Sequence, residues 1–202
     1  MKVKKLTLTL LILAPITLIS LLSFNSKVIS IKNKPMTEQE KKYGIDGQVA
    51  PELDKNIAWV DGEGKEISPV QLADYEGKFK VIYCFQSWCP GCHSAGLPSL
   101  QKMTAALADN ENMVFLAVQT VFEGAHANTK EKMLEVQKKY ELSIPFGHDM
   151  GTNKTNHISS IMYHYRTGGT PWFIFIAPDG KVLFNDYHVN TEKAIEYLKS
   201  IK

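Results

Sequence analysis

The sequence predicts an α/β domain in which helices flank a central mixed β-sheet and a β-hairpin precedes it. Two continuous runs of apolar, β-branched and aromatic residues, at 80–86 and 113–119, are typical of strands buried on both faces. The segment 129–140 has apolar residues at helical spacing with charges between them. Strands and helices that alternate, and then close with a second hairpin and a helix, favour this fold class.

The first elements are a hairpin and a buried strand that leads into a helix. The hairpin is expected at 57–67, around a turn of Asp and Gly residues. The strand at 80–86 precedes a helix from Cys92 to Leu107, which Gly96 and Pro98 are expected to bend. The later elements are a strand at 113–119, a helix at 129–140 capped by Asn128 or Thr129, a polar segment after Phe146, a helix at 158–165, a strand at 172–177, a turn at 178–180, a strand at 181–184 and a helix at 191–201.

The N-terminal 26 residues form a targeting or membrane segment. Three lysines lie within the first five residues, and an uncharged apolar stretch follows them to position 26. As a helix this stretch would be roughly 30 Å long, close to the thickness of a bilayer core. We expect a retained anchor at 1–26, a polar tether at 27–48 and one domain at 49–202, with a cleaved signal peptide as the alternative. Both interpretations place the domain outside the cytoplasm, either membrane-anchored or secreted and periplasmic.

Composition excludes two classes of protein. Of the 23 basic residues only Arg166 is an arginine, whereas nucleic-acid binders rely on arginine forks and clustered positive charge. No nucleic-acid partner is therefore expected. Three cysteines are too few for a disulfide-stapled scaffold, and an odd number leaves at least one thiol unpaired within the chain.

The motif Trp88-Cys89-Pro90-Gly91-Cys92 stands where the strand at 80–86 gives way to a helix. Free N–H groups and the dipole at a helix start stabilise an anion, so a thiolate is favoured at Cys89. Pro90 suits the first helical position because it has no N–H to satisfy. Cys92 lies one turn deeper on the same face, within disulfide reach. This spacing predicts thiol-disulfide exchange, in which Cys89 attacks and Cys92 resolves, with the cysteine pair as the redox group and no other cofactor.

The same cysteines allow a second interpretation. Because His93 follows Cys92, residues 89–93 also match the C-x-x-C-H pattern of c-type haem attachment. A zinc site would need a second ligand pair, which the sequence lacks at conventional spacing, so no metal is expected. A position between a strand and a helix of an α/β chain favours the exchange chemistry. A haem- or metal-binding module is the alternative.

A second motif, Gly168-Gly169-Thr170-Pro171-Trp172, leads into the strand at 172–177. Pro171 opens that strand, a position compatible with a cis peptide bond. Together with WCPGC, the segment APDGKV at 177–182 and the terminal helix, this motif resembles the thioredoxin superfamily. The segment 49–85 is similar to extracytoplasmic, membrane-tethered disulfide reductases of the TlpA/ResA type. The resemblance covers residues 49–202.

The resemblance assigns roles to the residues of both motifs. It implies that Cys89 is the exposed nucleophile and Cys92 the buried resolving thiol. Thr170 and a cis-Pro171 would face the dithiol, where the backbone before the proline pairs with a substrate strand. The substrate-binding residues are then expected to be Trp88, Pro90, Gly91, Thr170 and Pro171.

The proton acceptor is where this sequence departs from thioredoxins. Thioredoxins carry a buried Asp six positions before the first cysteine, and Tyr83 stands there. The TlpA/ResA branch uses a Glu just after the second core strand, and Glu123 lies close to that place. We expect Glu123 to accept the proton of Cys92, with a solvated loop carboxylate as the alternative.

These observations predict a disulfide reductase that acts on protein disulfides or dithiols. In an oxidising compartment a reductase needs a membrane electron donor for its own reduction, which suits an anchored domain. An oxidase or isomerase is the alternative within the same fold. Cys84, on the buried strand, is expected to be a small core residue, with a regulatory disulfide as the alternative. Trp88 and Trp172 flank the two motifs and suit either partner docking or core packing.

Overall fold

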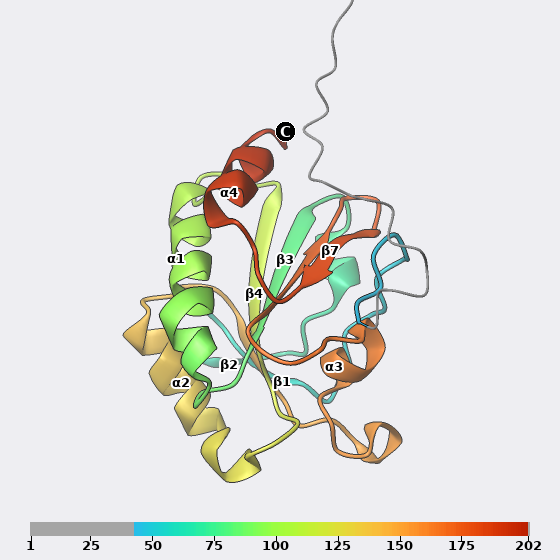
Figure 1. Cartoon of the computed structure of the whole chain (residues 1–202), viewed down its shortest axis with the longest axis vertical. Helices are drawn as coiled ribbons and strands as arrows, with labels where there is room; N and C mark the ends of the chain where they lie inside the picture. Colours follow the sequence, from blue (N-terminus) through green and yellow to red (C-terminus); the bar gives the residue numbers. More distant parts are fainter. Residues whose placement is uncertain (1–42, 202) are drawn as a thin grey trace, which may run out of the picture. The chain divides into compact units, whose positions relative to one another are not determined.

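The computed structural model describes residues 43–201 and contains a seven-stranded mixed sheet in the order β2-β1-β5-β4-β3-β6-β7 (Figure 1). β3, β4 and β5 run parallel, β1 and β6 pair antiparallel to β5 and β3, and the edge strands β2 and β7 pair antiparallel to β1 and β6. This arrangement confirms the predicted fold class, including the hairpin ahead of the sheet. The strands are β1 (Ala58–Val60), β2 (Glu66–Ile67), β3 (Phe79–Phe85), β4 (Met113–Thr120), β5 (Phe146–Asp149), β6 (Trp172–Ile176) and β7 (Val182–Asp186).

Helices cover both faces of the sheet. In Figure 1, α1 and α2 lie to one side of the strands and α3 lies to the other. The two faces bury separate apolar cores, because successive side chains of the fully buried strand β3 point to opposite faces: Tyr83 and Phe85 join one core, and Ile82 and Cys84 the other. The helices are α1 (Leu97–Ala106), α2 (Lys130–Lys139), α3 (Ser160–Tyr165) and α4 (Thr191–Lys199).

The helix predicted from Cys92 to Leu107 consists of two parts. Its first part is a π-helical turn, η2 (Cys92–Gly96), in which the Leu97 N–H donates to Cys92 O five residues earlier. The α-helix α1 begins only at Leu97, with Pro98 in its first turn. Proline has no N–H to donate, and the hydrogen-bond pattern changes from π-helical to α-helical in this stretch, at Gly96 and Pro98, where the sequence predicts an irregularity.

β5 is the strand that the sequence pattern did not show. It was expected to be the start of a polar segment, because it contains His148 and Asp149. Both side chains have buried partners: His148 Nδ1 bonds Gln119 Oε1, and Asp149 Oδ2 accepts from the Ser159 and Ser160 hydroxyls. Polar residues are tolerated within a sheet when their hydrogen bonds are satisfied. A strand that contains such residues is not recognised from a run of apolar residues.

The predicted anchor and most of the predicted tether lie outside the described residues. Between residues 43 and 201 no helix combines the length and the apolar character that crossing a membrane requires. The described end of the tether is hydrogen-bonded to the domain: Gly44 N–H donates to Arg166 O, and Gly47 N–H donates to Val182 O. Residues just before Val49 therefore already pack on the domain.

Candidate active site

Cys89 and Cys92 lie at the carboxyl end of β3, where the chain enters the helical turn. The helical segment starts at Pro90, so Cys89 occupies the capping position and its carbonyl accepts the first helical bond, from His93 N–H. The Cys92 N–H donates to Cys89 Sγ at 3.2 Å. The Cys89 sulfur thus has a backbone donor aimed at it from the start of a helix. Cys89 is 7% exposed and Cys92 is 0% exposed, so an incoming disulfide reaches Cys89 first.

The loop before β6 closes over the cysteine pair. The Thr170–Pro171 peptide bond is cis, and Cys89 Sγ lies 3.6 Å from Thr170 O. Gly91 is packed so closely that a Cβ atom there would lie 3.2 Å from Pro171 Cδ. The structure thus brings together five of the predicted site residues: Cys89, Cys92, Gly91, Thr170 and Pro171.

The environment of Cys92 holds its thiol protonated. Burial, followed by its hydrogen bond with Cys89, raises the pKa of Cys92 to about 12. The backbone of Gln86 and the side chain of Thr170 oppose this rise by hydrogen bonding. Because a thiolate is the attacking species in disulfide exchange, Cys92 is a reluctant nucleophile in the reduced protein.

Tyr83 lies beneath Cys92. Its side chain is fully buried, and its hydroxyl donates to Cys92 O at 3.5 Å. Burial and the nearby Cys92 raise the pKa of Tyr83 well above its ordinary value. A Cβ atom at Gly96 would overlap Tyr83 Oη, so this glycine is what allows the phenol to reach the active-site turn. The group under Cys92 is therefore a neutral phenol.

Glu123 is the predicted site residue that the structure does not join to the cysteine pair. Its side chain is exposed, and its backbone oxygen accepts from Asn128 Nδ2 at 3.1 Å. The groups that shift the pKa of Cys92 are Cys89, Gln86 and Thr170, and Glu123 is not among them. The next residue, Gly124, turns the loop with a φ of +58°.

The two tryptophans that flank the motifs have different environments. Trp88 is 46% exposed and packs on the glycine of the next loop, where a Cβ at Gly124 would lie 3.1 Å from Trp88 Nε1. Trp172 is buried, and its Nε1 donates to Asn185 Oδ1. Only Trp88 is available to contact a partner beside Cys89.

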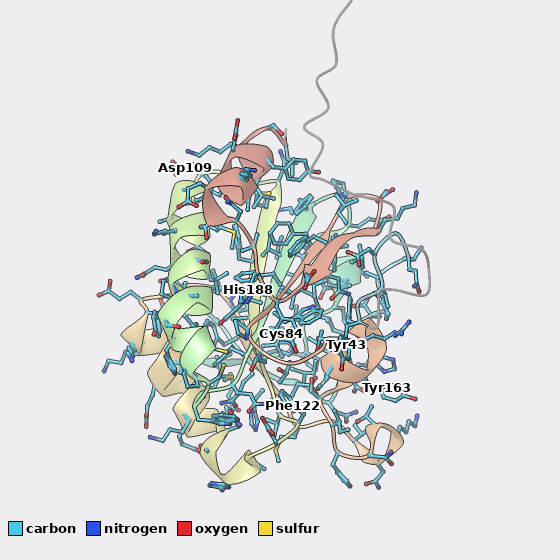
Figure 2. The ribbon with its side chains drawn as sticks, in the orientation of Figure 1. Tyr43, Cys84, Asp109, Phe122, Tyr163 and His188 are labelled. Carbon is cyan, nitrogen blue, oxygen red and sulfur yellow. The ribbon has the colours of Figure 1, made fainter. Side chains whose placement is uncertain are left out.

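Cys84 is a core residue of the central strand (Figure 2). It is fully buried, and its neighbours in the core on that face include Ile82 and Val118. Burial raises the pKa of Cys84 well above its ordinary value, and Asp149 and Cys92 add to the rise. Such a thiol is unreactive, which supports the expected packing role.

Sequence reasoning missed the polar network that holds the loop before Cys89. Ser87 N–H donates to Asn128 Oδ1 at 2.8 Å, and Gln119 Nε2 donates to Ser87 Oγ. Ser87 O lies 2.7 Å from His93 Nε2. The available signal was that Ser87 and Gln119 end two otherwise apolar strand runs. The backbone N–H, the carbonyl and the hydroxyl of Ser87, two residues before Cys89, thus bond to three separate segments of the chain.

The haem interpretation of residues 89–93 does not fit this geometry. A haem attached through both cysteines would need their sulfurs at the surface, whereas Cys92 has no exposed area. It would also need a free ring nitrogen on His93, whereas Nε2 faces Ser87 O and Nδ1 faces Tyr140 Oη. Within residues 43–201 no three His, Cys, Asp or Glu side chains gather as metal ligands would.

Comparisons with known proteins identify the family and the fold. The Redoxin family matches residues 46–200. Thiol-disulfide oxidoreductase ResA from Oceanobacillus iheyensis is 28% identical over 148 residues, which are 73% of this chain and 67% of the relative. Among solved structures, the thioredoxin-like superfamily protein SPOA0173 has a TM-score of 0.66 at 28% identity, over 76% of this chain and 95% of that chain. A thiol-disulfide isomerase from Corynebacterium glutamicum has a TM-score of 0.63 at 27% identity, over 75% and 96%. The thioredoxin-like fold is thereby confirmed, and the chain belongs to the Redoxin family.

Proposed function

We propose that this chain is an extracytoplasmic thiol-disulfide oxidoreductase that reduces protein disulfides through Cys89 and Cys92. The observation that carries the proposal is the setting of Cys89 Sγ. It accepts an N–H from Cys92 at 3.2 Å and lies 3.6 Å from Thr170 O. The sulfur is thus stabilised as a thiolate at the place where the loop of Pro171 offers backbone to a substrate strand.

The reaction consists of two exchanges. The Cys89 thiolate attacks one sulfur of a substrate disulfide, and the other substrate sulfur leaves as a thiolate that takes up a proton. Cys92 then loses its proton and attacks Cys89 Sγ, which releases the second substrate sulfur and forms the Cys89–Cys92 disulfide. Two electrons and two protons pass to the substrate, and the protein is oxidised by the same amount.

Substrate contact is assigned to the rim around Cys89. Trp88 presents a half-exposed ring, and Pro90 is exposed at the start of the turn. Gly91, Thr170 and Pro171 leave the sulfur approachable by an extended polypeptide, with the Thr170 carbonyl at 3.6 Å. An aromatic ring beside a polar backbone edge suits a protein segment with an apolar residue near its disulfide.

The proposed direction of electron flow and the proposed location outside the cytoplasm are supported by the N-terminal segment and by the relatives. The apolar stretch at 6–26 behind a lysine cluster supports export and anchoring. An anchored reductase outside the cytoplasm would be re-reduced by a membrane electron donor. The names of the relatives include an oxidoreductase and an isomerase, which supports the reaction class, and oxidase or isomerase activity is the alternative direction.

Glu123 as the proton acceptor of Cys92 stays a prediction. For this role the loop after β4 would have to carry the exposed carboxylate to the buried thiol when substrate binds. Slower resolution in Glu123→Gln, with unchanged attack by Cys89, would support the role. Identical rates for both steps across pH would remove it.

Three measurements test the proposed function. Equilibration with thiol buffers gives the potential of the Cys89–Cys92 pair: a value near or below about −250 mV supports a reductase, and one near about −120 mV reverses the direction. Cys92→Ser should accumulate mixed disulfides on Cys89 with partner proteins, and Cys89→Ser should accumulate none. Cys84→Ala serves as the matched control with the pair intact. A Cys92→Ser chain that traps nothing, together with no reduction of insulin by the unaltered chain, would overturn the proposal.

A further inference from the structure

Two glycines precede Thr170 in the loop that leads to β6, and glycine gives this loop more conformational freedom than any other residue would. Ordering a glycine costs more backbone entropy than ordering any other residue. Gly169 has a φ of +144°, a conformation that residues with side chains rarely adopt, and Gly168 precedes it. The loop nevertheless places the Thr170 carbonyl oxygen 3.6 Å from Cys89 Sγ. Contacts from outside the loop are therefore needed to hold it in this place.

Tyr187, the residue that follows β7, lies against both glycines. Its hydroxyl donates to the carbonyl oxygen of Gly168, and a carbonyl can only accept, so the direction of this hydrogen bond is fixed. A Cβ atom at Gly169 would lie 2.9 Å from Tyr187 Oη and 3.4 Å from its Cε1. A Cβ atom at Gly168 would lie 3.0 Å from the same Oη. The lack of side chains on these two residues thus lets the phenol approach the loop backbone.

The Tyr187 ring is packed in an aromatic cluster with Trp172 and Tyr43. It meets Trp172 edge-on, with centroids 4.5 Å apart, and Trp172 Nε1 donates to Asn185 Oδ1. Tyr43 also meets Trp172 edge-on, at 6.4 Å, and a Cβ atom at Gly168 would lie 2.9 Å from Tyr43 Cδ2. Burial, and after it Tyr43, raises the pKa of Tyr187, so the hydroxyl keeps the proton that it donates. The phenol is therefore a fixed support for the loop.

The residues just before the glycines are also held from other segments. Asn185 Nδ2 donates to Tyr165 O at 3.0 Å, and the Gly44 N–H, from the described end of the tether, donates to Arg166 O at 2.8 Å. The carbonyl groups of Tyr165, Arg166 and Gly168 thus all accept from donors that lie far away along the chain. Of these three bonds, the one to Gly168 is nearest to the active site in the sequence.

We propose that Tyr187 is a positioning residue for a polypeptide substrate: its hydroxyl fixes the loop so that the Thr170 backbone is presented beside Cys89 before substrate binds. Tyr187 acts through the two glycines and not on the reacting sulfurs. A loop that is already ordered spares the complex the entropy cost of ordering it on binding. The inference rests on the proposed function, because a polypeptide substrate is what would use the backbone edge at Thr170.

The first test measures the mobility of the loop in the reduced full-length chain. Backbone ¹⁵N relaxation gives order parameters for Gly168, Gly169 and Thr170 in the unaltered chain, in Tyr187→Phe and in Tyr163→Phe, a matched control that alters an exposed tyrosine on α3. We expect values near about 0.85, typical of rigid backbone, in the unaltered chain and the control, and lower values in Tyr187→Phe alone. A mobile loop in the unaltered chain, or equal values in Tyr187→Phe, would overturn the proposal.

The second test compares a protein substrate with a small reagent. Insulin reduction, with dithiothreitol as the electron source, and alkylation of Cys89 by iodoacetamide are measured in the same three chains. Iodoacetamide needs access to the sulfur but no backbone pairing, so alkylation in Tyr187→Phe should be no slower than in the unaltered chain. Insulin reduction should fall roughly threefold to tenfold, mainly through a higher KM, which is the factor expected from the loss of one hydrogen bond.

The outcomes separate positioning from a general structural role. Insulin reduction in Tyr187→Phe at the rate of the unaltered chain would overturn the proposal. An equal fall of both rates would also overturn it, because it would indicate damage to the thiol or to the fold, and urea unfolding measures the latter independently. If the unaltered chain reduces no insulin although Cys89 is alkylated, the proposed function fails instead, and the relaxation measurement still decides whether Tyr187 holds the loop.

Discussion

The step in which Cys92 displaces the substrate from Cys89 is expected to accelerate steeply with pH. Burial is the main cause that raises the pKa of Cys92 from 9.0 to about 12. At that pKa about one thiol in 10⁵ is ionised at pH 7, against about one in 100 at the ordinary value. A more basic thiolate is also more nucleophilic, so each ionised Cys92 should attack about 20-fold faster for a rise of three pKa units. Resolution at pH 7 is therefore expected to be at most about 50-fold slower than with an unperturbed thiol, because the part of the rise that Cys89 causes is absent from the mixed disulfide.

An aryl disulfide whose halves are released as coloured thiolates separates the two steps. Attack by Cys89 releases the first half, and attack by Cys92 on Cys89 Sγ releases the second. In the mixed disulfide Cys89 no longer ionises, but the burial of Cys92 remains, so the second rate should rise about tenfold for each pH unit from 7 to 9 without levelling. Cys92→Ser is the control, because it should release only the first half.

A second phase that levels off below about pH 8 would refute this reasoning. Such a plateau would mean that a nearby group takes the proton of Cys92 and compensates for its burial. Repeating the measurement in Glu123→Gln would then show whether the loop carboxylate is that group. A plateau that survives this substitution would point to the loop around Thr170, which already hydrogen-bonds the cysteine.

Three further predictions concern stability, and each is measured by urea unfolding. Gly96→Ala should lower the free energy of unfolding by about 1–3 kcal/mol, because its Cβ would overlap Tyr83 Oη and lie 2.8 Å from Pro171 Cβ; adding Tyr83→Phe should restore part of the loss, and no recovery would exclude that contact as the cause. Asn128→Ala should cost about 1–2 kcal/mol, because it leaves a partly buried backbone N–H and carbonyl groups without their partner, and a loss below about 0.5 kcal/mol would contradict this. Because the folded chain keeps the Cys92 proton that the unfolded chain loses above pH 9, Cys92 should contribute a loss of about 1 kcal/mol between pH 9 and 10, beside that of the buried Cys84, and Cys92→Ala should fall less over the same range.

The sequence identified those parts of the site whose residues are close neighbours along the chain. The two cysteines and the proline before β6 each stand at the end or start of an apolar run, and short motifs mark them. Both segments meet in the structure at a 3.6 Å contact between Cys89 Sγ and Thr170 O. The fold class followed from the same runs, because two fully apolar strands require helices on both faces.

The parts that sequence reasoning missed depend on contacts between distant residues. The bond between His93 and Tyr140 joins positions 47 residues apart, and that between Ser87 and Asn128 joins positions 41 apart. The spacing of apolar and polar residues along the sequence gives no sign of such distant pairs. Glu123 shows the reverse problem: it was assigned by its place after β4, but the side chain at that place is exposed.

The polar residues that end the apolar strands explain how one sulfur becomes reactive while its neighbour does not. The N–H, carbonyl and hydroxyl of Ser87 are held by Asn128, His93 and Gln119, so the backbone that leads to Cys89 has little freedom. A loop fixed in this way keeps Cys89 Sγ in line with the Cys92 N–H before substrate arrives, which removes an ordering cost from the attack. The same close packing excludes water from Cys92 and raises its pKa. The proposed distinction between attacking and resolving thiol thus comes from the one-turn separation of the cysteines: at the cap the sulfur has a backbone donor, and one turn deeper it is buried in the apolar core.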